Sequence, residues 1–325
     1  MGDGRIQERK VVVVGAGAVG STFAYALAMS GLAEEIVLLD PNESLARGQV
    51  LDLVHGQPYF PTVHIHPGGP ADYADAALIV ITAGAKQQPG QTRLALLQTN
   101  ARIMESIMDA IVAAHSRAVV VVVSNPVDVL TFVAARRTGW PRGRVMGSGT
   151  VLDSARLRYM LGAYCHVDTH NAHGYILGEH GDSEFAAWSM THIGGLPIDD
   201  YCASCQACGD WRARRAEIEK EVRESAYHII GYKGATCYAV GLALTRIAGA
   251  ILRGERSILT VSTLLQGEYG LKDVCLSVPC LVSDRGVERV IQGRLRPEEQ
   301  QALERSASIL QSALGDLDKG GITPA

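Results

Sequence analysis

The chain has 325 residues, enough for one large domain or two. Hydrophobic residues make up 47% of it, and the net charge of −4 comes without any marked basic run, so we expect no nucleic-acid partner. No apolar stretch approaches the roughly 18 residues that a membrane-spanning helix needs. The polar start also lacks the apolar part of a secretory signal, so we expect no membrane partner and a cytoplasmic location.

Short apolar runs alternate with helical patterns through the first half of the chain. Because these runs are apolar throughout, they favour strands that are buried on both faces of a parallel sheet. The alternation predicts a Rossmann-type doubly wound α/β domain, to which we assign residues 1–147. The expected strands are 11–14, 36–39, 63–66, 77–82 and 118–123, and the expected helices are 19–30, 44–55 and 94–115.

A glycine-rich turn, GAGAVG at residues 15–20, follows the first expected strand and opens the first helix. Gly15 permits a tight turn, Gly17 lets the backbone approach a pyrophosphate, and Gly20 allows close helix–strand packing. The helix that begins at Val19 offers free N–H groups and a positive dipole end to phosphates. In this position between strand and helix, the turn predicts a dinucleotide site.

Asp40 ends the second expected strand, 20 residues after Gly20. A carboxylate at this place accepts hydrogen bonds from a ribose diol and repels a 2′-phosphate, which favours NAD over NADP. The alternative is that Asp40 only begins an Asp-Pro-Asn turn.

The second half of the chain predicts long helices and a pair of strands. We assign residues 148–325 to an α+β substrate-binding domain packed on the first, with the site in the cleft between the two. The expected helices are 212–232, 235–253 and 297–314, and the expected strands are 258–262 and 274–282.

Five further segments combine with the glycine turn into a recognisable pattern. Together they resemble the lactate/malate dehydrogenase family, most closely its bacterial L-lactate dehydrogenases, from about Lys10 to Leu314. The resemblance implies an NAD-dependent enzyme that interconverts pyruvate and L-lactate. The segments are 82–93, SNPVD at 124–128, 149–158 with LDSAR, GEHGDS at 178–183 and KGAT at 233–236.

Reduction of a 2-keto acid needs a proton donor for the carbonyl oxygen. His180 suits this role, because the ordinary pKa of histidine lies close to working pH. The resemblance implies that Asp153 binds the other ring nitrogen, which would fix the tautomer and stabilise the imidazolium. The alternative is a helix-capping aspartate and an ordinary loop histidine.

The substrate carboxylate needs a cation. Arg156 follows Asp153 by one helical turn, so both can face one site, and its planar fork suits a carboxylate. By resemblance, residues 84–93 form a lid whose closure brings Arg93 against the carbonyl. Asn125 is expected to bind the reacting oxygen or the nicotinamide; alternatively it forms a turn before Pro126.

Substrate choice is expected to depend on Gln87. Malate enzymes of the family carry an arginine six residues before the lid arginine, whereas this chain has a neutral amide there. A second carboxylate would then be buried unpaired, which costs several kcal/mol. Thr236 is expected to line the same end of the pocket. Lys86 beside the selector could supply a charge, so malate dehydrogenase or another 2-hydroxy-acid dehydrogenase is the alternative.

Arg158 and His173 occupy places where bacterial family members activated by fructose 1,6-bisphosphate carry Arg and His across a subunit interface. The resemblance implies such an effector site and a homotetramer, with an effector-tightened dimer as second choice. The alternative is an interface that binds no ligand.

Two groups of metal-binding residue types remain. Cys202, Cys205 and Cys208 are one thiol short of a full ligand set and would rotate round a helix instead of converging. His64 and His66 share one face of a strand but show no third ligand nearby in sequence. We therefore expect no metal site.

Overall fold

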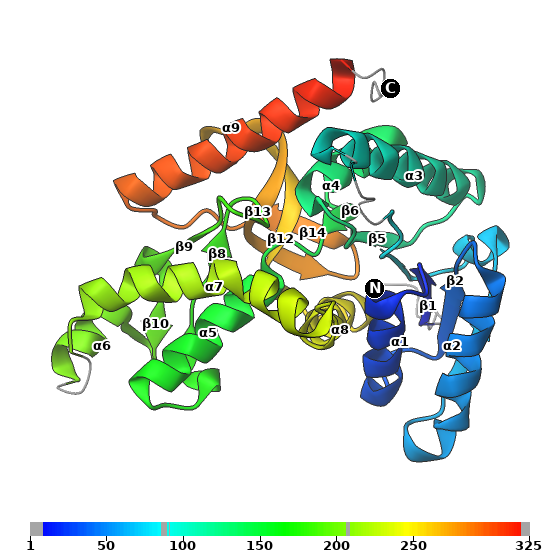
Figure 1. Cartoon of the computed structure of the whole chain (residues 1–325), viewed down its shortest axis with the longest axis horizontal. Coiled ribbons are helices and arrows are strands. Elements are labelled where there is room, and N and C mark those ends of the chain that lie inside the picture. The colour runs from blue at the N-terminus through cyan, green and yellow to red at the C-terminus, as the bar shows by residue number, and fades with distance from the viewer. Residues whose placement is uncertain (1–8, 86–89, 91, 206–208, 320–325) are drawn as a thin grey trace, which may run out of the picture.

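The computed structural model describes residues 9–85, 90, 92–205 and 209–319. Its centre is a nine-stranded sheet in the order β14-β13-β12-β6-β5-β4-β1-β2-β3 (Figure 1). The six strands of the first half run parallel in the order 3-2-1-4-5-6, which is the order of dinucleotide-binding sheets. They are β1 (Lys10–Val14), β2 (Glu35–Leu39), β3 (His64–Pro67), β4 (Leu78–Ile81), β5 (Val119–Val122) and β6 (Val145–Gly147).

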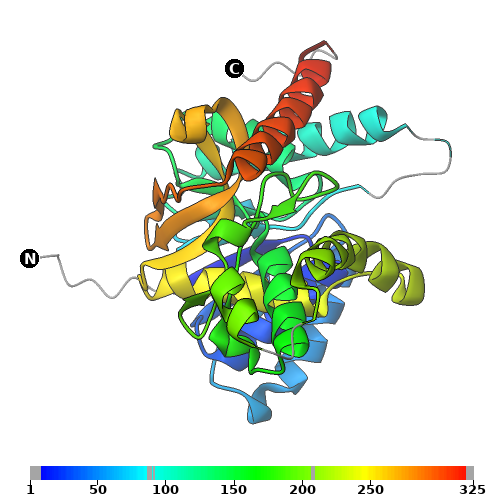
Figure 2. The same cartoon turned by 90° about the vertical axis from the view of Figure 1, so that its left-hand side faces the viewer.

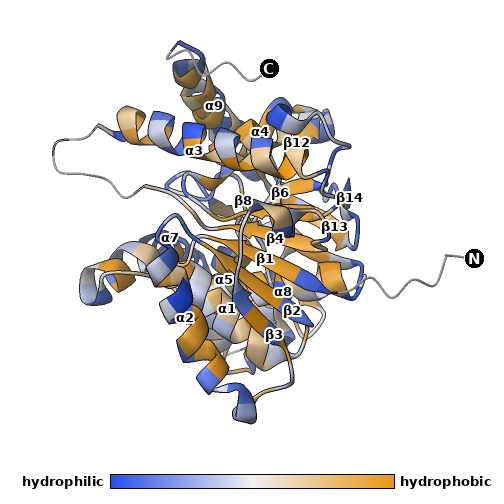
Figure 3. Cartoon of the chain, turned by 90° about the vertical axis from the view of Figure 1, so that its right-hand side faces the viewer, coloured by the Kyte–Doolittle hydropathy of each residue, from blue (hydrophilic) through white to orange (hydrophobic). Residues whose placement is uncertain are grey.

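Helices cover both faces of this parallel sheet. Figure 3 shows α3 and α4 on one side of the apolar strands and α1, α2 and α8 on the other. Every residue of β1, β4 and β5 is buried, which explains why these strands are apolar throughout. The predicted fold class is therefore confirmed. The helices are α1 (Ala18–Ser30), α2 (Glu43–His55), α3 (Arg93–Ala113) and α4 (Val127–Thr138).

Three antiparallel strands from the second half extend the same sheet. They are β12 (Ser257–Gln266), β13 (Lys272–Ser283) and β14 (Gly286–Val290). The junction is the antiparallel pairing of Ser262 with Gly147. A Cβ on Gly147 would clash with the Thr131 hydroxyl, so glycine suits this position. The two halves thus share a backbone-bonded sheet, a connection that the sequence did not predict.

The other elements of the second half pack on both sides of the extended sheet. In Figures 1 and 2, α9 lies across the antiparallel strands, while α5, α6 and α7 gather on the other side. A separate apolar cluster, which includes Leu157, Trp188 and Trp211, holds α5 and α7 together. The elements are α5 (Val151–Cys165), α6 (Ile198–Ser204), α7 (Trp211–Lys233), α8 (Tyr238–Leu252), α9 (Pro297–Lys319), β7 (Ala172–His173), β8 (Ile176–Leu177), β9 (Phe185–Ala186), β10 (His192–Ile193) and β11 (Leu196–Pro197).

Helix α8 begins at Tyr238, three residues later than the expected start at 235. Among the described residues, no helix is both long and apolar enough to cross a membrane.

Candidate active site

A cavity of about 640 Å³ lies where the two halves of the chain meet. It brings together residues from α3, the start of α4, α5, the loop between β8 and β9, α7 and α9. Five residues that the sequence predicted for substrate chemistry line its wall: Arg93, Asn125, Asp153, Arg156 and His180. The lining includes Arg93, Asn125, Asp153, Arg156, His180, Glu184, Arg223, Tyr227 and Asp316.

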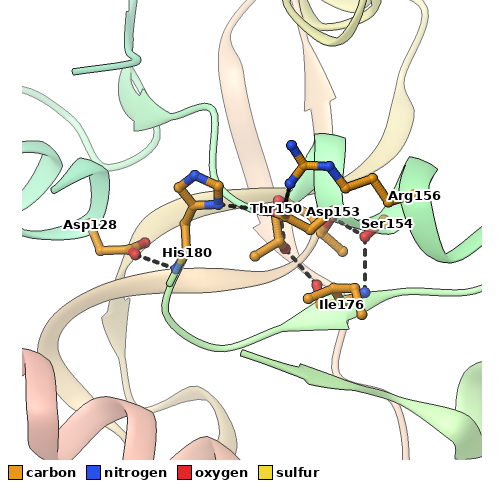
Figure 4. Close-up of polar contacts among 8 residues, drawn as sticks. Asp128, Thr150, Asp153, Ser154, Arg156, Ile176 and His180 are labelled. Atoms are coloured by element: carbon orange, nitrogen blue, oxygen red, sulfur yellow. Dashed lines mark hydrogen bonds and ion pairs between the residues drawn. The ribbon is translucent and has the colours of Figure 1, made fainter. Parts of the chain in front are cut away.

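Asp153 connects two of these side chains. It lies in the first turn of α5, where a negative charge interacts favourably with the helix dipole, and it is only 1% exposed. One carboxylate oxygen, Oδ2, lies 2.7 Å from Nδ1 of His180 (Figure 4). The other, Oδ1, accepts a hydrogen bond of 2.6 Å from Nη1 of Arg156, one helical turn later. Asp153 therefore orients the histidine and the arginine at once.

The charge of this pair favours a protonated histidine. Burial lowers the pKa of His180, but the charge and hydrogen bond of Asp153 outweigh it and raise that pKa to about 9. Burial raises the pKa of Asp153, but the charges and hydrogen bonds of His180 and Arg156 lower it by more, so the net shift of this pKa is downward. The side chain of His180 keeps 27% of its exposure, and Nδ1 is engaged by Asp153. This leaves Nε2 as the ring nitrogen that can transfer a proton.

Arg93 enters the cavity from the first residue of α3, whose N-terminus is capped by Thr92. Arg156 enters from α5. Two guanidinium groups and an imidazolium on one wall suit an anionic substrate with an oxygen that accepts a proton.

Two buried polar side chains that the sequence did not single out support this wall. Asp128 in α4 is 1% exposed and accepts a hydrogen bond of 2.7 Å from the backbone N–H of His180. Asn100 in α3 accepts from the Ala85 N–H at 2.8 Å and donates to the Asn125 carbonyl at 3.2 Å. It thus ties the segment before residue 86 to the Asn125 turn. Asp128 stands inside the SNPVD segment, but the sequence does not indicate this contact with His180.

Glu184 and Arg223 also line the cavity and were not predicted. Burial, and then the charge of Asp153, raise the pKa of the Glu184 carboxyl, which favours its protonated form. Arg223 donates a hydrogen bond of 3.3 Å to the backbone carbonyl of Glu184 and lies 3.7 Å from the Glu219 carboxylate. Arg223 is therefore a third guanidinium group in the cavity wall, and its partners are the Glu184 carbonyl and the Glu219 carboxylate.

The glycine turn has the shape of a phosphate cradle. Gly15 has a φ of +105°, and a Cβ there would lie 2.8 Å from Ala83 N. A Cβ on Gly20 would lie 1.9 Å from the Gly15 carbonyl oxygen, so this position excludes any side chain. A Cβ on Gly17 would meet no protein atom within 4 Å, which leaves its surface open to a ligand. Val19 lies in the first turn of α1, as the predicted site requires.

Asp40 begins the turn that its sequence position allowed and also contacts the glycine turn. Its Oδ1 accepts from the Asn42 N–H at 2.9 Å, as in an Asp-Pro-Asn turn, and its Oδ2 accepts from the Ala16 N–H at 2.8 Å. The second bond places the carboxylate beside the glycine turn. Each oxygen retains acceptor capacity for a ribose hydroxyl. The residues at this end of the sheet therefore fit a dinucleotide.

Comparison with known proteins assigns the family. A sequence model described as the NAD binding domain of lactate/malate dehydrogenase matches residues 9–147. A second, described as the alpha/beta C-terminal domain of the same family, matches residues 150–319. This chain belongs to the lactate/malate dehydrogenase family. NAD is accordingly its cofactor, as the sequence predicted.

Several members of the family match nearly the whole of this chain. An L-lactate dehydrogenase of Treponema denticola is 59% identical over 312 residues, which are 96% of this chain and 99% of that protein. One from Acetivibrio thermocellus is 48% identical over 95% of this chain and 98% of that protein. The crystal structure of a lactate dehydrogenase from a Medee basin deep-sea metagenome library superposes with a TM-score of 0.93 at 42% identity, covering 96% of this chain and 99% of that one.

Other predicted residues of this family member lie away from the cavity wall or outside the described residues. Thr236 is half-buried between α7 and α8 and is not among the residues that line the cavity. Gln87 and the neighbouring Lys86 lie outside the described residues, as does Cys208. Cys202 lies in α6 and Cys205 follows its end, so the helix does not continue through the expected cluster.

The two residues predicted for an effector lie close to each other in the fold. Nε of Arg158 in α5 donates a hydrogen bond of 2.7 Å to the carbonyl of Ala172, the residue before His173. His173 is exposed on β7. Arg158 also lines a second cavity of about 330 Å³ together with Arg246.

Proposed function

We propose that this chain catalyses the NAD-dependent interconversion of pyruvate and L-lactate, the activity for which its relatives are named. The observation that carries the proposal is the position of Asp153 between His180 and Arg156, on a cavity wall that Arg93 also lines. Residues 1–147 supply the cofactor site, and residues 148–325 supply most of the substrate site.

His180 is the general acid in this mechanism. In pyruvate reduction, NADH held at the glycine turn would supply the hydride for the new C–H bond at the carbonyl carbon. The carbonyl π electrons move to the oxygen, which takes the proton from Nε2 of His180. Asp153 holds Nδ1 and stabilises the imidazolium before transfer. In lactate oxidation the neutral imidazole takes the hydroxyl proton back.

The arginines divide the substrate between them. Arg156, already oriented by Asp153, binds the pyruvate carboxylate with its planar fork. Arg93 polarises the carbonyl bond and stabilises the developing negative charge on its oxygen. Asn125 lines the same cavity and donates to the reacting oxygen or to the nicotinamide side.

Gln87 selects pyruvate in this proposal, whereas Thr236, which does not line the cavity, would reach the methyl end of the substrate only through a rearrangement of the chain between α7 and α8. A neutral amide offers no partner to the second carboxylate of oxaloacetate, and an unpaired buried charge costs several kcal/mol. Since about 1.4 kcal/mol corresponds to tenfold, a pyruvate preference of about a thousandfold is expected.

At the cofactor end, Gly15, Gly17 and Gly20 hold the pyrophosphate together with the first turn of α1, in which Val19 lies. Asp40 binds the ribose hydroxyls and disfavours a 2′-phosphate, which selects NAD over NADP.

The experiment that tests the proposal compares kcat/KM for NADH oxidation with pyruvate and with oxaloacetate. A strong pyruvate preference supports both the activity and the role of Gln87. A preference for oxaloacetate would overturn the substrate assignment in favour of malate dehydrogenase chemistry. A His180→Gln variant is the control, because it keeps the size of the side chain and removes the transferable proton; undiminished turnover in this variant would overturn the role of His180.

Arg158 and His173 form a fructose 1,6-bisphosphate site between subunits of a homotetramer in this proposal. Their closeness in the fold and the exposure of His173 support it. An arginine and a histidine from paired subunits would bind the negatively charged phosphate groups. If the sugar bisphosphate changes neither the pyruvate saturation curve nor the oligomer size at pH 6, the regulatory role is wrong.

A further inference from the structure

Glu35, His64 and His66 converge at the outer edge of the parallel sheet. β3 is the last strand of that sheet (Figure 3). Its register with β2 places Glu35 opposite His64. His64 and His66 are two residues apart, so their side chains leave the same face of β3. The neighbouring strand therefore provides the third side chain that the sequence of β3 alone lacked.

The ligand atoms of these three side chains lie close together. One ring nitrogen of each histidine and one carboxylate oxygen of Glu35 are all within 4.8 Å of one another. Zn²⁺ binds nitrogen and oxygen ligands at about 2.0–2.2 Å in a tetrahedral arrangement, which places two ligands of one ion about 3.4 Å apart. The side chain of His64 is exposed, so a rotamer change can bring its ring nitrogen to that separation.

The hydrogen bonds of His66 point to an ion at Nε2. Nδ1 lies 3.0 Å from the carbonyl oxygen of Pro67, and Nε2 lies 2.9 Å from Oε1 of Glu35. Nε2 is therefore the ring nitrogen that faces the Glu35 carboxylate. A metal-binding histidine typically donates its other N–H to a backbone carbonyl, which is the arrangement at Nδ1.

The local charge also favours a cation. Lys10 is the ammonium group beside Glu35, and it is bound as well by Asp72 and Asp75, at 3.0 and 2.9 Å. Three carboxylates thus surround one ammonium group and outnumber it. A divalent ion at Glu35 would compensate that excess.

We propose that Glu35, His64 and His66 bind a divalent transition-metal ion of the Zn²⁺ class. Two imidazoles and one carboxylate are ligands for Zn²⁺, Co²⁺ or Ni²⁺, and not the all-oxygen set that Ca²⁺ or Mg²⁺ prefers. The ion bridges β3 to β2 and so stabilises the edge of the sheet. The site lies at the amino ends of the parallel strands, whereas the glycine turn lies at their carboxyl ends, so it is separate from the cofactor site.

The test measures Zn²⁺ bound by the chelator-treated full-length protein in equilibrium dialysis. We expect wild type to bind one more ion per chain than His64→Gln or Glu35→Gln. His55→Gln, which changes an exposed histidine at the end of α2, is the matched control and should bind as much as wild type. The comparison is made between variants because Asp153, His180 and Glu184 form another cluster that could take an ion.

A second measurement does not depend on counting ions. Zn²⁺ should raise the Tm of wild type and of His55→Gln by more than that of His64→Gln, since only the first two can bridge the strands. Turnover with pyruvate should be the same in all three proteins. Equal Zn²⁺ binding by wild type and His64→Gln, or no binding by wild type, would overturn the proposal and leave an imidazolium–carboxylate pair at His66.

Discussion

The carboxylate of Asp128 accepts a hydrogen bond of 2.7 Å from the backbone N–H of His180, although 52 residues separate the two. Asp128 belongs to the first turn of α4, and His180 lies in the loop between β8 and β9. The bond thus fixes the loop of the proposed acid to a helix of the nucleotide-binding half. Asp153 holds the ring of the same histidine, so backbone and side chain are positioned from two different helices.

Replacing Asp128 by alanine should destabilise the protein and slow turnover. It leaves the buried N–H of His180 without its acceptor, which costs about 1–3 kcal/mol in the free energy of unfolding. Chemical denaturation and steady-state kinetics measure the two effects. Asp128→Asn is the control, because its amide oxygen can still accept the bond. If the alanine variant matches wild type in both stability and kcat, this contact does not position the histidine.

The pH dependence of pyruvate reduction should follow the proton on His180. Because Asp153 raises that pKa to about 9, kcat/KM for pyruvate should be high near neutral pH and fall as pH rises through about 9. Lactate oxidation, which needs the neutral ring, should show the opposite trend. In Asp153→Asn the fall should move to lower pH, toward the ordinary histidine value of about 6.5. A pH profile that Asp153→Asn leaves unchanged would contradict this pairing.

The same pair should make stability depend on pH. The pKa of His180 is higher in the folded than in the unfolded protein. Its contribution to the free energy of unfolding is therefore fully present below about pH 6.5 and is lost as pH rises through about 9. Thermal unfolding at pH 6 and pH 9.5 tests this. The difference in Tm between the two pH values should be smaller in His180→Gln than in wild type, and an equal difference would argue against the assignment.

Gln87→Arg should shift the substrate preference toward oxaloacetate. The new cation would pair with the second carboxylate, so the kcat/KM ratio of oxaloacetate to pyruvate should rise by about a thousandfold, since each 1.4 kcal/mol is tenfold. Lys86→Gln is the control and should keep the wild-type preference. If Lys86→Gln alone lowers activity on oxaloacetate, the flanking lysine already reaches the substrate and Gln87 is not the selector.

Two glycine variants should separate cofactor binding from folding. Gly17→Ala adds a methyl group that meets no protein atom within 4 Å, so the protein should fold normally but show a raised KM for NADH. Gly20→Ala places its methyl group 1.9 Å from the Gly15 carbonyl oxygen and should lower the Tm. Fluorescence titration with NADH and thermal unfolding measure both. A Gly17→Ala variant with unchanged NADH affinity would contradict the predicted cradle.

Glu184→Gln should leave turnover at neutral pH close to that of wild type. Burial and the charge of Asp153 favour the protonated carboxyl, which a glutamine amide imitates in shape and neutrality. Glu184→Lys in the same assay should be strongly impaired, because it adds a buried positive charge beside His180. A large loss in the glutamine variant would mean that the ionised carboxylate is required.

The sequence by itself determined the features that depend on local spacing. Continuous apolar runs such as that of β5 predicted buried parallel strands, because both faces of those strands must be covered. The spacing of Gly15, Gly17 and Gly20 predicted the turn between β1 and α1. The single helical turn between Asp153 and Arg156 correctly implied that both face one site, because a helix repeats every 3.6 residues.

Only the tertiary structure decided which distant residues meet. Asp128 reaches His180, Asn100 reaches the Asn125 turn, and Glu35 joins His66, each from a different element. None of these contacts has a local signature, because any buried polar residue needs some partner and its own neighbours do not say which. The pairing of β6 with β12 was hidden for the same reason: strand edges join through backbone groups that every residue carries, so side-chain patterns do not reveal which edges pair.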